Sequence, residues 1–403
     1  MRVLQLWYEA SHGGGVAAHV SLLSKQLQAR GHEVTGLQLS SEPSAMDAGS
    51  SRRIHRLPGS YGPLQGQLLR PALRRIVSET RPELVHVHGC FTTLSAVLLA
   101  DLRRNAPVVG TLHDIRPFCY LMTRRFAPTG TLCQRRCGIG CFLSGCVRPS
   151  GIADLLRFPR RWWVDALNLT QWSKLDRIVV PSTYLLDLAL QHGIAAHRIQ
   201  VIPNGIVVPP DAAARRSETN PPLLLFVGGL LHYKGPNLFV RALDRLRDRP
   251  WQAILIGDGP MRETLQRETE RLALAHRICF YGHVADRDVI DRFLSQARLL
   301  ALPSTIPESF SLAGIEALAM GAPVVTFGLG GTREWFRDGE NGLRAADGDI
   351  EDLARKIARL LDDPQMARRM GESGHAMVAS RFTADLALER LLAVYSEVSG
   401  VAA

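Results

Sequence analysis

The stretch ESFSLAGIE, residues 308–316, places two carboxylates eight residues apart around a short turn of hydroxyl-bearing and glycine residues. It continues as ALAMGAPVVTFGLGG, residues 317–331, which predicts a helix end, a Gly-Ala-Pro turn and a buried strand. In doubly wound sheets, ligands bind beyond the carboxyl ends of the strands, where helix N-termini present free N–H groups. The segment therefore predicts a loop acid, an anion-binding helix start and a second acid about two helical turns further on.

Apolar strands alternate with amphipathic helices along both halves of the chain. The strand candidates of the first half are RVLQLWY, EVTGLQL, ELVHVHG, PVVGTLH and RIVVPS. Those of the second half are LLLFVGG, WQAILIGDG, ICFYGHV, RLLALPS and APVVTF. This alternation predicts an α/β protein with parallel, doubly wound sheets that carry helices on both faces.

The length of 403 residues predicts two domains, because single hydrophobic cores stop growing near about 250–300 residues. We expect an N-terminal domain over residues 1–203 and a C-terminal domain over residues 223–380. Residues 204–222 are rich in Pro, Ala and polar side chains, which is typical of a linker. The amphipathic helix over residues 381–403 has no strand after it, and we expect it to cross back to the N-terminal domain.

Positive charge is concentrated in the first half. Residues 1–205 carry 24 Lys and Arg against 12 Asp and Glu, a net of +12, so the stated total of +10 leaves −2 for residues 206–403. This asymmetry predicts a polyanionic neighbour, either nucleic acid or an anionic membrane surface with lipid-phosphate substrates. An arginine-rich composition with only four lysines explains the same excess without a partner.

No run of 18 apolar residues occurs, so we expect no segment that spans a bilayer. The start, MRVLQLWYEASHGGG, reads as a strand and a glycine loop and lacks the long apolar region of a signal peptide. We therefore expect a cytoplasmic protein.

A phosphate signal lies in LFVGGLLHYKG, residues 225–235. Gly228 and Gly229 follow a strand, and Lys234 begins the next helix, where its charge can neutralise a diphosphate. A merely solvated surface lysine is the alternative, but a lysine beside glycines after a strand favours a phosphate role. Together with the two acids, this pattern suits a ligand with phosphate in the middle and hydroxyl groups at both ends, which describes a nucleotide sugar.

A second glycine loop, Gly13, Gly14 and Gly15, follows the first strand and opens a helix. Glycines allow the backbone to approach an anion closely. The loop lacks the G-x-G-x-x-G spacing of a dinucleotide site, and a tight turn without a ligand is the alternative.

His113 and Asp114 end the strand PVVGTLHD. A histidine at the carboxyl end of a strand can donate to a sugar hydroxyl or assist proton movement, and a structural loop histidine is the alternative. His86 and His88 alternate by two, so they share one face of the sheet. A metal would need a third ligand that the sequence does not identify, and we expect a packed or cleft-facing pair.

Five of the seven cysteines fall within residues 119–146. Cys133, Cys137, Cys141 and Cys146 are separated by three, three and four residues, which does not match the paired C-x-x-C of a zinc ribbon. Structural zinc, reduced thiols and disulfides all stay open, and we take structural zinc on these four cysteines as the working hypothesis. A catalytic zinc is not expected, because no carboxylate or histidine motif accompanies the cluster.

Two further patterns have ordinary explanations as well. The triplet DRD, residues 286–288, resembles acidic metal sites, but acids at a helix start are favoured by the helix dipole alone. The segment RFPRRWWVDALNLTQWSK, residues 157–174, mixes arginines with Trp162, Trp163 and Trp172. This mixture suits either a membrane interface or a helix with buried tryptophans.

Four stretches of the second half together resemble the retaining glycosyltransferases of family 4, which have the GT-B fold. They are VGGLLHYKG, IPNGI, PESFSLAGIEALAMGAPVV and GGTREWFRDGENGL. The glycine loop and TLHD resemble the family more loosely, and the cysteine-rich residues 119–146 are similar to an insert in some members that build exopolysaccharides. The resemblance implies two Rossmann-like domains that face a central cleft, with the donor on the C-terminal domain and the acceptor on the N-terminal one.

The resemblance also implies roles for individual residues. Glu308 would contact the transferred sugar, Glu316 would hold the nucleotide ribose, and Lys234 would neutralise the diphosphate. His113 would lie near the donor sugar, so the expected catalytic set is Glu308, His113 and Lys234. The expected contacts to the nucleotide sugar are Gly14, Gly15, Gly229, Lys234, Ser309, Phe310, Ser311, Leu312 and Glu316.

Two positions depart from the family pattern. The family often has an arginine five residues before the lysine, where this chain has Gly229. The Gly-Phe-Gly that often lies between the acids is Ser309-Phe310-Ser311 here. Serine still offers backbone N–H groups and adds hydroxyl donors, so anion binding is expected to persist.

We therefore expect a retaining glycosyltransferase that needs no cofactor for catalysis, with the departing diphosphate as proton acceptor. The expected acceptor is a polyprenyl-diphosphate-linked sugar at the inner membrane face, on the way to exopolysaccharide or lipopolysaccharide. Another GT-B enzyme, such as a nucleotide-sugar epimerase or a phosphorylase, and a transferase with a soluble acceptor are the alternatives. A non-enzymatic nucleic-acid binder is not expected, since no aromatic RNA-binding motif or zinc-finger spacing occurs.

Overall fold

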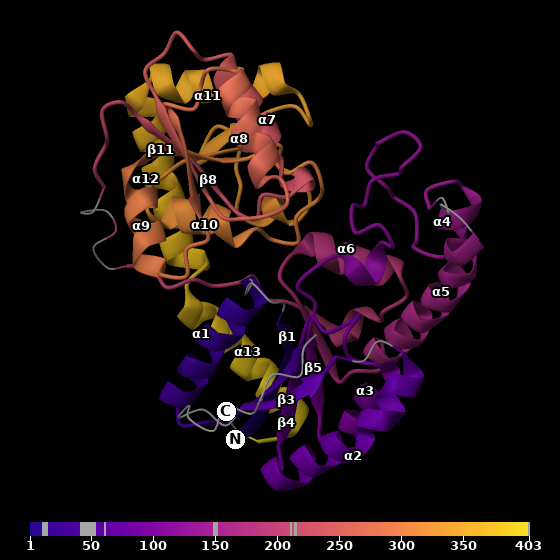
Figure 1. Ribbon diagram of the computed structural model, residues 1–403. Helices are drawn as coiled ribbons and strands as arrows, with labels where there is room; N and C mark the ends of the chain where they lie inside the picture. The colour runs from indigo at the N-terminus through magenta and orange to yellow at the C-terminus, as the bar shows by residue number, and fades with distance from the viewer. Residues whose placement is uncertain are drawn as a thin grey trace. The chain divides into compact units, whose positions relative to one another are not determined.

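The computed structural model describes residues 1–9, 15–40, 54–59, 62–147, 152–209, 212 and 216–401. The chain folds into two compact units (Figure 1). Met1–Pro203 and Ala387–Ala403 form the first unit, and Asn204–Leu386 forms the second. Each unit has one parallel sheet between layers of helices, which confirms the predicted α/β class with doubly wound sheets.

The first unit contains a seven-stranded parallel sheet with the order β3-β2-β1-β4-β5-β6-β7. Its strands are β1 (Arg2–Glu9), β2 (Glu33–Ser40), β3 (Ile54–Pro58), β4 (Leu84–His88), β5 (Val108–Thr111), β6 (Arg177–Val180) and β7 (Ile199–Val201). Its helices are α1 (Gly15–Ala29), α2 (Pro63–Thr80), α3 (Ala96–Asn105), α4 (Ile139–Leu143), α5 (Ile152–Trp172) and α6 (Thr183–Gln191), with short 3-10 turns at Arg116–Phe118 and Ala196–Arg198.

Both faces of this sheet are buried, because successive side chains of each strand point to opposite sides. In β4, Val85 and Val87 pack against α2, α3, α5 and α6. Leu84 packs on the other face, against α1 and the last helix α13 (Ala384–Ser399). His86 and His88 follow the alternation of Leu84, so both lie on the α1 and α13 face. This confirms the prediction that they share one face of the sheet.

The last helix, α13, packs on the first unit (Figure 1). Its buried residues Leu388, Leu391 and Leu392 join the same apolar cluster as residues of α1 and of four central strands. The Tyr395 hydroxyl lies 2.6 Å from Nδ1 of His86, and both side chains are fully buried. A hydrogen bond inside the apolar cluster therefore adds to the packing that holds this helix on the sheet.

The second unit contains a six-stranded parallel sheet with the order β10-β9-β8-β11-β12-β13. Its strands are β8 (Leu223–Val227), β9 (Gln252–Ile256), β10 (Ile278–Gly282), β11 (Ala297–Leu302), β12 (Val324–Thr326) and β13 (Gly342–Arg344). Its helices are α7 (Pro236–Asp244), α8 (Arg262–Arg271), α9 (Arg287–Gln296), α10 (Leu312–Ala319), α11 (Ile350–Asp362) and α12 (Pro364–Arg381), with 3-10 turns at His232–Lys234 and Gly331–Glu334.

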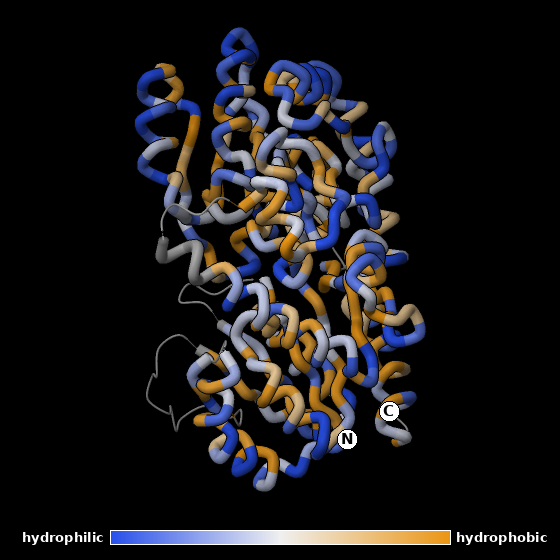
Figure 2. Tube along the Cα trace, turned by 90° about the vertical axis from the view of Figure 1, so that its right-hand side faces the viewer, coloured by the Kyte–Doolittle hydropathy of each residue, from blue (hydrophilic) through white to orange (hydrophobic). Residues whose placement is uncertain are grey.

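Helices cover both faces of the second sheet as well. One apolar cluster joins the sheet to α7, α8 and α11, and another joins it to α9, α10 and α12. In β8 the side chains of Leu224 and Phe226 belong to the first of these clusters, and Leu223 and Leu225 belong to the second. Figure 2 shows that the outer turns of the helices are mostly hydrophilic in each unit.

Residues 204–222, for which we expected a linker, belong by their contacts to the second unit. Ile206 pairs with Thr383 as an isolated parallel bridge, and its side chain is buried in the cluster of α9, α10 and α12. Ala212 is buried in the same cluster. The described part of this segment is therefore packed against a domain and does not hang free between two.

Tyr395→Phe tests how the last helix is held. The change removes the hydroxyl and leaves a buried nitrogen of His86 without its partner, so we expect the first unit to lose about 1–3 kcal/mol of stability. Thermal unfolding followed by circular dichroism measures the loss. Tyr281→Phe, at a half-exposed tyrosine of β10, is the matched control and should leave the midpoint unchanged. Equal midpoints for the two variants would contradict this account.

Candidate functional site

The strand order of the second sheet reverses between β8 and β11. In a doubly wound sheet the crevice beyond the carboxyl ends of such a strand pair is where ligands bind. β8 ends at Val227 and leads through a glycine pair to Lys234, and β11 ends at Leu302 and leads through a short loop to Glu308. The two predicted catalytic residues of the second half therefore meet at the topological switch point of this unit.

Lys234 and Glu308 form an ion pair there. The Lys234 ammonium donates to both carboxylate oxygens of Glu308, at 2.8 Å each, and the Ser304 hydroxyl donates to Oε1 of the same carboxylate. The Lys234 side chain is 30% exposed and that of Glu308 only 12%. The pair is therefore shielded enough to be stronger than a surface ion pair, yet the lysine still faces solvent and can reach an added anion.

Glycines allow the backbone segments of this site to approach one another. Gly235, just after Lys234, has a φ of 72°, and a Cβ there would lie 2.0 Å from the carbonyl oxygen of Pro303. Gly330, after β12, has a φ of 69°, and a Cβ there would lie 2.5 Å from the Glu308 carbonyl oxygen. The amide of Gly331 donates to that same oxygen at 2.6 Å. Glu308 is thus fixed through its backbone as well as its side chain.

Gly229 stands where the glycosyltransferase family often has an arginine. The surrounding atoms leave room for a side chain at this position. A Cβ at this position would meet Leu231 at 3.4 Å, an ordinary contact distance. The neighbouring Gly228 has a φ of 153°, and its amide donates to Ile256 at the end of β9. The absence of a side chain at Gly229 therefore leaves room beside the glycine loop without being needed for the fold.

The loop between the two acids leads into α10. Phe310 is fully buried, and its carbonyl oxygen accepts a 2.6 Å hydrogen bond from the indole of Trp335. Its side chain is thus a core residue and leaves only its backbone for the predicted ligand contact. Ser311, just before the first residue of α10, has a φ of 68°, a left-handed conformation that glycine adopts without strain. Leu312 begins the helix, and Ser309 is half-buried before the turn.

Glu316, the second acid, lies on α10 and has a basic partner that the sequence did not identify. Arg287 of α9 pairs with Glu316 at 2.5 Å and with Asp291 at 2.9 Å. Burial raises the pKa of Glu316, while the Arg287 guanidinium acts in the opposite direction. Asp286 caps α9 by accepting a hydrogen bond from the amide of Asp288 at 3.0 Å. The acidic triplet therefore begins a helix, where the helix dipole favours acids.

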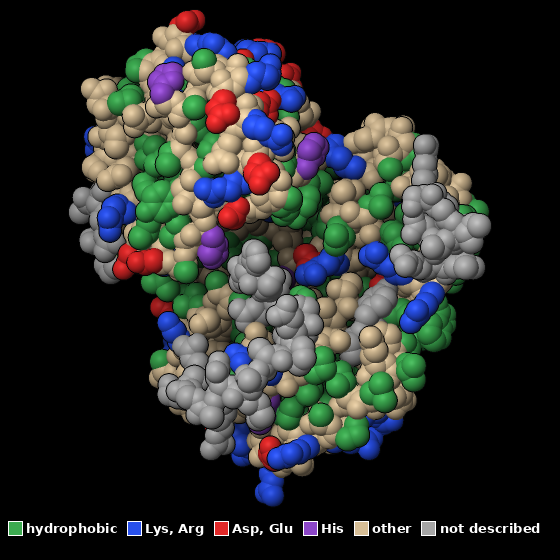
Figure 3. Space-filling view, viewed as in Figure 1, with side chains coloured by type: hydrophobic (Ala, Val, Ile, Leu, Met, Phe, Trp, Pro, Cys, Tyr) green, Lys and Arg blue, Asp and Glu red, His purple; other side chains and the backbone are tan. Residues whose placement is uncertain are grey.

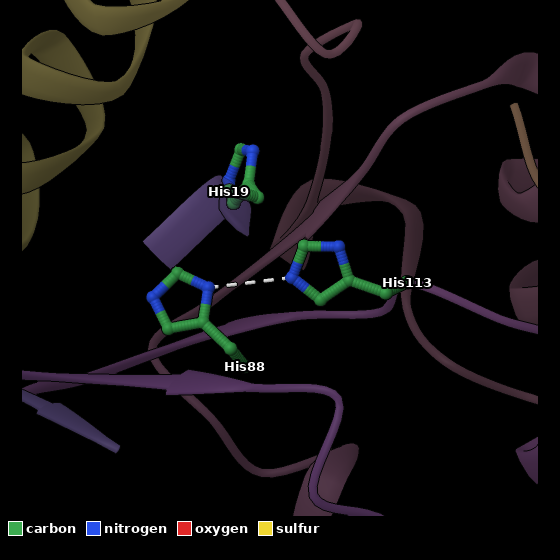
Figure 4. Close-up of side chains that lie close together, drawn as sticks. All are labelled: His19, His88 and His113. Atoms are coloured by element: carbon green, nitrogen blue, oxygen red, sulfur yellow. Dashed lines mark hydrogen bonds between the residues drawn. The ribbon is translucent and has the colours of Figure 1, made fainter. Parts of the chain in front are cut away.

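In the first unit, His113 follows β5 and lies beside His88 at the end of neighbouring β4 (Figure 4). Nδ1 of His88 is 3.3 Å from Nε2 of His113, and His19 of α1 packs edge-on against both rings. Burial lowers the pKa of His19 to about 4 and holds those of His88 and His113 well below their usual range, so all three are neutral at pH 7. No local pattern identified His19, because α1 brings it to β4 and β5 only in the fold.

His86 has a different role from its neighbour His88. Its Nδ1 lies 2.6 Å from the Tyr395 hydroxyl, and its Nε2 lies 2.7 Å from the Thr111 hydroxyl. Both ring nitrogens of this buried side chain therefore have partners. Of the predicted glycine loop, Gly15 is the exposed first residue of α1, and Gly13 and Gly14 lie outside the described residues.

The cysteine-rich segment brings two of its four predicted zinc ligands into contact. Cys137 donates a hydrogen bond to the sulfur of Cys141, which lowers the pKa of Cys141 to about 6 and raises that of Cys137. All seven cysteines are free thiols, and no three of them gather within metal-binding reach in the described part of the chain. Zinc on Cys133, Cys137, Cys141 and Cys146 stays a prediction.

Comparison with known proteins places both units among sugar-transferring enzymes. Residues 13–208 match the model "Glycosyltransferase Family 4", and residues 209–377 match "Glycosyl transferases group 1". The glycogen synthase of Mycobacterium tuberculosis is 27% identical over 95% of this chain and 91% of that protein. These matches cover nearly the whole chain between them.

Two solved structures show the same fold. Anabaena Alr3699/HepE, solved in complex with UDP and glucose, is 21% identical, with a TM-score of 0.69 over 98% of this chain and 99% of that one. WaaG, a glycosyltransferase involved in lipopolysaccharide biosynthesis, is 17% identical, with a TM-score of 0.68 over 99% of this chain and 100% of that one. Both likenesses confirm the predicted fold of two Rossmann-like domains.

Ser311→Gly tests the strained turn before α10. A non-glycine residue in the left-handed region costs roughly 1–2 kcal/mol, and glycine loses about 0.5–1 kcal/mol through its extra freedom in the unfolded chain. We therefore expect a net gain between zero and about 1.5 kcal/mol, measured as a higher melting temperature. Ser309→Gly is the matched control, because Ser309 is not in that region, and it should lower stability by about 0.5–1 kcal/mol. A loss of stability in both variants would show that Ser311 is not strained.

Proposed function

Since the chain belongs to the family 4 glycosyltransferases with the GT-B fold, we propose that it moves a sugar from a nucleotide-diphosphate sugar to a glycan acceptor with retention of configuration. The second unit binds the donor and the first unit binds the acceptor. The observation that carries this proposal is the Lys234–Glu308 pair at the β8/β11 switch point. One further support is that the Anabaena relative was solved with UDP and glucose.

Lys234 is the group that stabilises the leaving diphosphate. In the free protein its charge is balanced by Glu308, and a bound diphosphate offers it a second anionic partner. As the bond to the sugar breaks, negative charge grows on the leaving phosphate, and a fixed ammonium lowers the energy of that charge. Because the Lys234 side chain is already positioned by Glu308, little reorganisation is needed at the moment of reaction.

Glu308 and Glu316 have separate tasks in this proposal. Glu308 is held by Lys234 and Ser304 and orients the hydroxyl groups of the transferred sugar. Glu316 lies on α10 beside Arg287 and binds the ribose of the nucleotide. With a single acid assigned to the sugar, a double displacement, which uses two carboxyl groups about 5–5.5 Å apart, is not supported. The acceptor therefore attacks from the side that the diphosphate leaves, and the diphosphate takes up its proton.

Lys234→Ala tests the proposal directly. Removing one group that stabilises developing negative charge typically costs about 2.7–4 kcal/mol of barrier, so we expect turnover to fall by roughly 100-fold or more. The measurement is release of nucleoside diphosphate from a panel of nucleotide sugars, beginning with UDP-glucose. Lys174→Ala, which removes an exposed lysine in the first unit, is the matched control and should keep full activity. Wild-type turnover in Lys234→Ala, with an intact fold, would refute the role of Lys234.

We also propose that the acceptor is a polyprenyl-diphosphate-linked sugar at the cytoplasmic face of a membrane, in exopolysaccharide or lipopolysaccharide synthesis. The support lies in α5 and the cysteine-rich segment, where large apolar side chains face solvent. Trp162 and Trp163 are 40% and 52% exposed, and Ile139 and Leu143 of α4 are 57% and 76% exposed. Tryptophans and aliphatic side chains with neighbouring arginines are typical of surfaces that enter the membrane interface.

The positive charge of the first unit also favours binding to an anionic membrane surface. On the face drawn in Figure 3, basic side chains prevail among the charged groups of the first unit, and both signs mix over the second. Anionic lipid attracts such a surface by about 1 kcal/mol for each basic residue near it. Among the described helices, none combines the length and the apolar character needed to cross a bilayer.

A vesicle-flotation assay tests the membrane surface. We expect the protein to float with vesicles that contain phosphatidylglycerol and to float far less with neutral vesicles. Trp163→Ser should weaken binding about tenfold, because burial of roughly 60 Å² of apolar surface contributes about 1.5 kcal/mol. Tyr281→Ser, at a half-exposed aromatic residue of the second unit, is the matched control and should float as the wild type does. Failure to float with either kind of vesicle would favour a soluble acceptor.

A further inference from the structure

Three histidines of the first unit gather at the carboxyl ends of its central strands (Figure 4). From their geometry we propose that His19, His88 and His113 form a binding site for a divalent transition metal of the zinc class, with one coordination position left for an oxygen ligand. This site is separate from the cysteine-rich segment and rests on contacts within the first unit alone.

The spacing of the ring nitrogens fits such an ion. One nitrogen from each histidine lies within 4.8 Å of the nitrogens from the other two. Nδ1 of His88 and Nε2 of His113 are 3.3 Å apart. Two nitrogens bound tetrahedrally to zinc at about 2.0–2.1 Å are separated by about 3.3–3.4 Å, so this pair already has the separation that two ligands of one ion require.

Two of the three histidines lie in regular secondary structure, and the third follows a strand closely. His88 is the last residue of β4, and His113 lies two residues after β5, which is hydrogen-bonded to β4. His19 lies on α1, the helix that covers this face of the sheet. A site on packed strands and a helix keeps its ligands in position better than one on loops.

The neighbouring His86 supports the site without being a ligand. Both of its nitrogens already have partners, Tyr395 and Thr111, and its ring lies 3.8 Å from that of His88, centroid to centroid. The contact limits how the fully buried His88 ring can turn. His88 is thereby held with Nδ1 directed at His113, as a residue behind the ligands is expected to do in a metal site.

A simple hydrogen bond between two histidines is the competing explanation, and it leaves one feature without a cause. It uses Nδ1 of His88 and Nε2 of His113. It assigns nothing to His19, which has no hydrogen-bond partner among the described residues although it packs against both other rings. A shared ion accounts for the convergence of all three imidazoles.

The number of ligands indicates the kind of site. Structural zinc usually has four protein ligands, whereas sites with three leave a position for water or a substrate oxygen. His19 and His113 are only half-buried, so such a ligand has access from their side.

Metal titration tests the site independently of activity. The full chain carrying Cys137→Ser and Cys141→Ser is stripped with chelator and titrated with Zn²⁺ by calorimetry and with Co²⁺ by visible absorption. We expect one ion per chain and Co²⁺ bands without sulfur-to-metal charge transfer. His19→Ala in this background should weaken binding by at least about 100-fold, which exceeds the about 10- to 100-fold effect of residues that only support ligands.

Two matched variants make the result decisive. His19→Asp keeps a ligand at the same place on α1 and should restore most of the affinity, while His197→Ala removes an exposed histidine of the same unit and should change nothing. Circular dichroism confirms that each variant is folded. Absence of binding at micromolar metal, or equal affinity in His19→Ala and its parent, would overturn the proposal. Absence of transferase activity in the wild-type chain, with metal binding intact, would instead count against the proposed function.

Discussion

The second unit depends on one close approach, between the end of β8 and the end of β11. Lys234 and Glu308 lie 74 residues apart in the chain, yet their side chains meet because these two strands are neighbours in the sheet. The approach is possible only where side chains are missing: a Cβ on Gly235 would overlap the Pro303 carbonyl, and one on Gly330 would overlap that of Glu308. The switch point is therefore built from backbone contacts first, and the charged pair occupies the space that they define.

The two acids of this site, Glu308 and Glu316, each have a basic partner in the structure. Lys234 balances Glu308, and Arg287 balances Glu316, whose burial would otherwise favour its neutral form. Such pairing avoids an uncompensated charge in a poorly solvated site. It also holds both side chains in place, so that a ligand of the kind we propose would order fewer groups on binding.

The first unit uses its sheet in a similar way but with different chemistry. Strand alternation turns His86 and His88 to one face, and the next strand places His113 beside them. α1 then adds His19. His86 is tied to Tyr395 of the last helix, so the segment that completes the unit also supports the histidine cluster. The carboxyl ends of the central strands therefore form the chemically distinctive part of both units, as expected where parallel strands end together.

Periodicity, glycine positions and short motifs are local properties of the chain, and they were enough to predict the α/β class and two doubly wound sheets. They also identified Lys234, Glu308, Glu316 and His113 as candidates. The folded structure then established which of these residues come into contact. It paired Lys234 with Glu308 and Arg287 with Glu316, turned Phe310 into the core, and brought His19 to His88 and His113. The described part of residues 204–222 also packs on the second unit, where a linker was expected. These outcomes depend on strand order and on which face each helix covers, and no local pattern of side chains encodes the distance between residues that lie far apart in the chain.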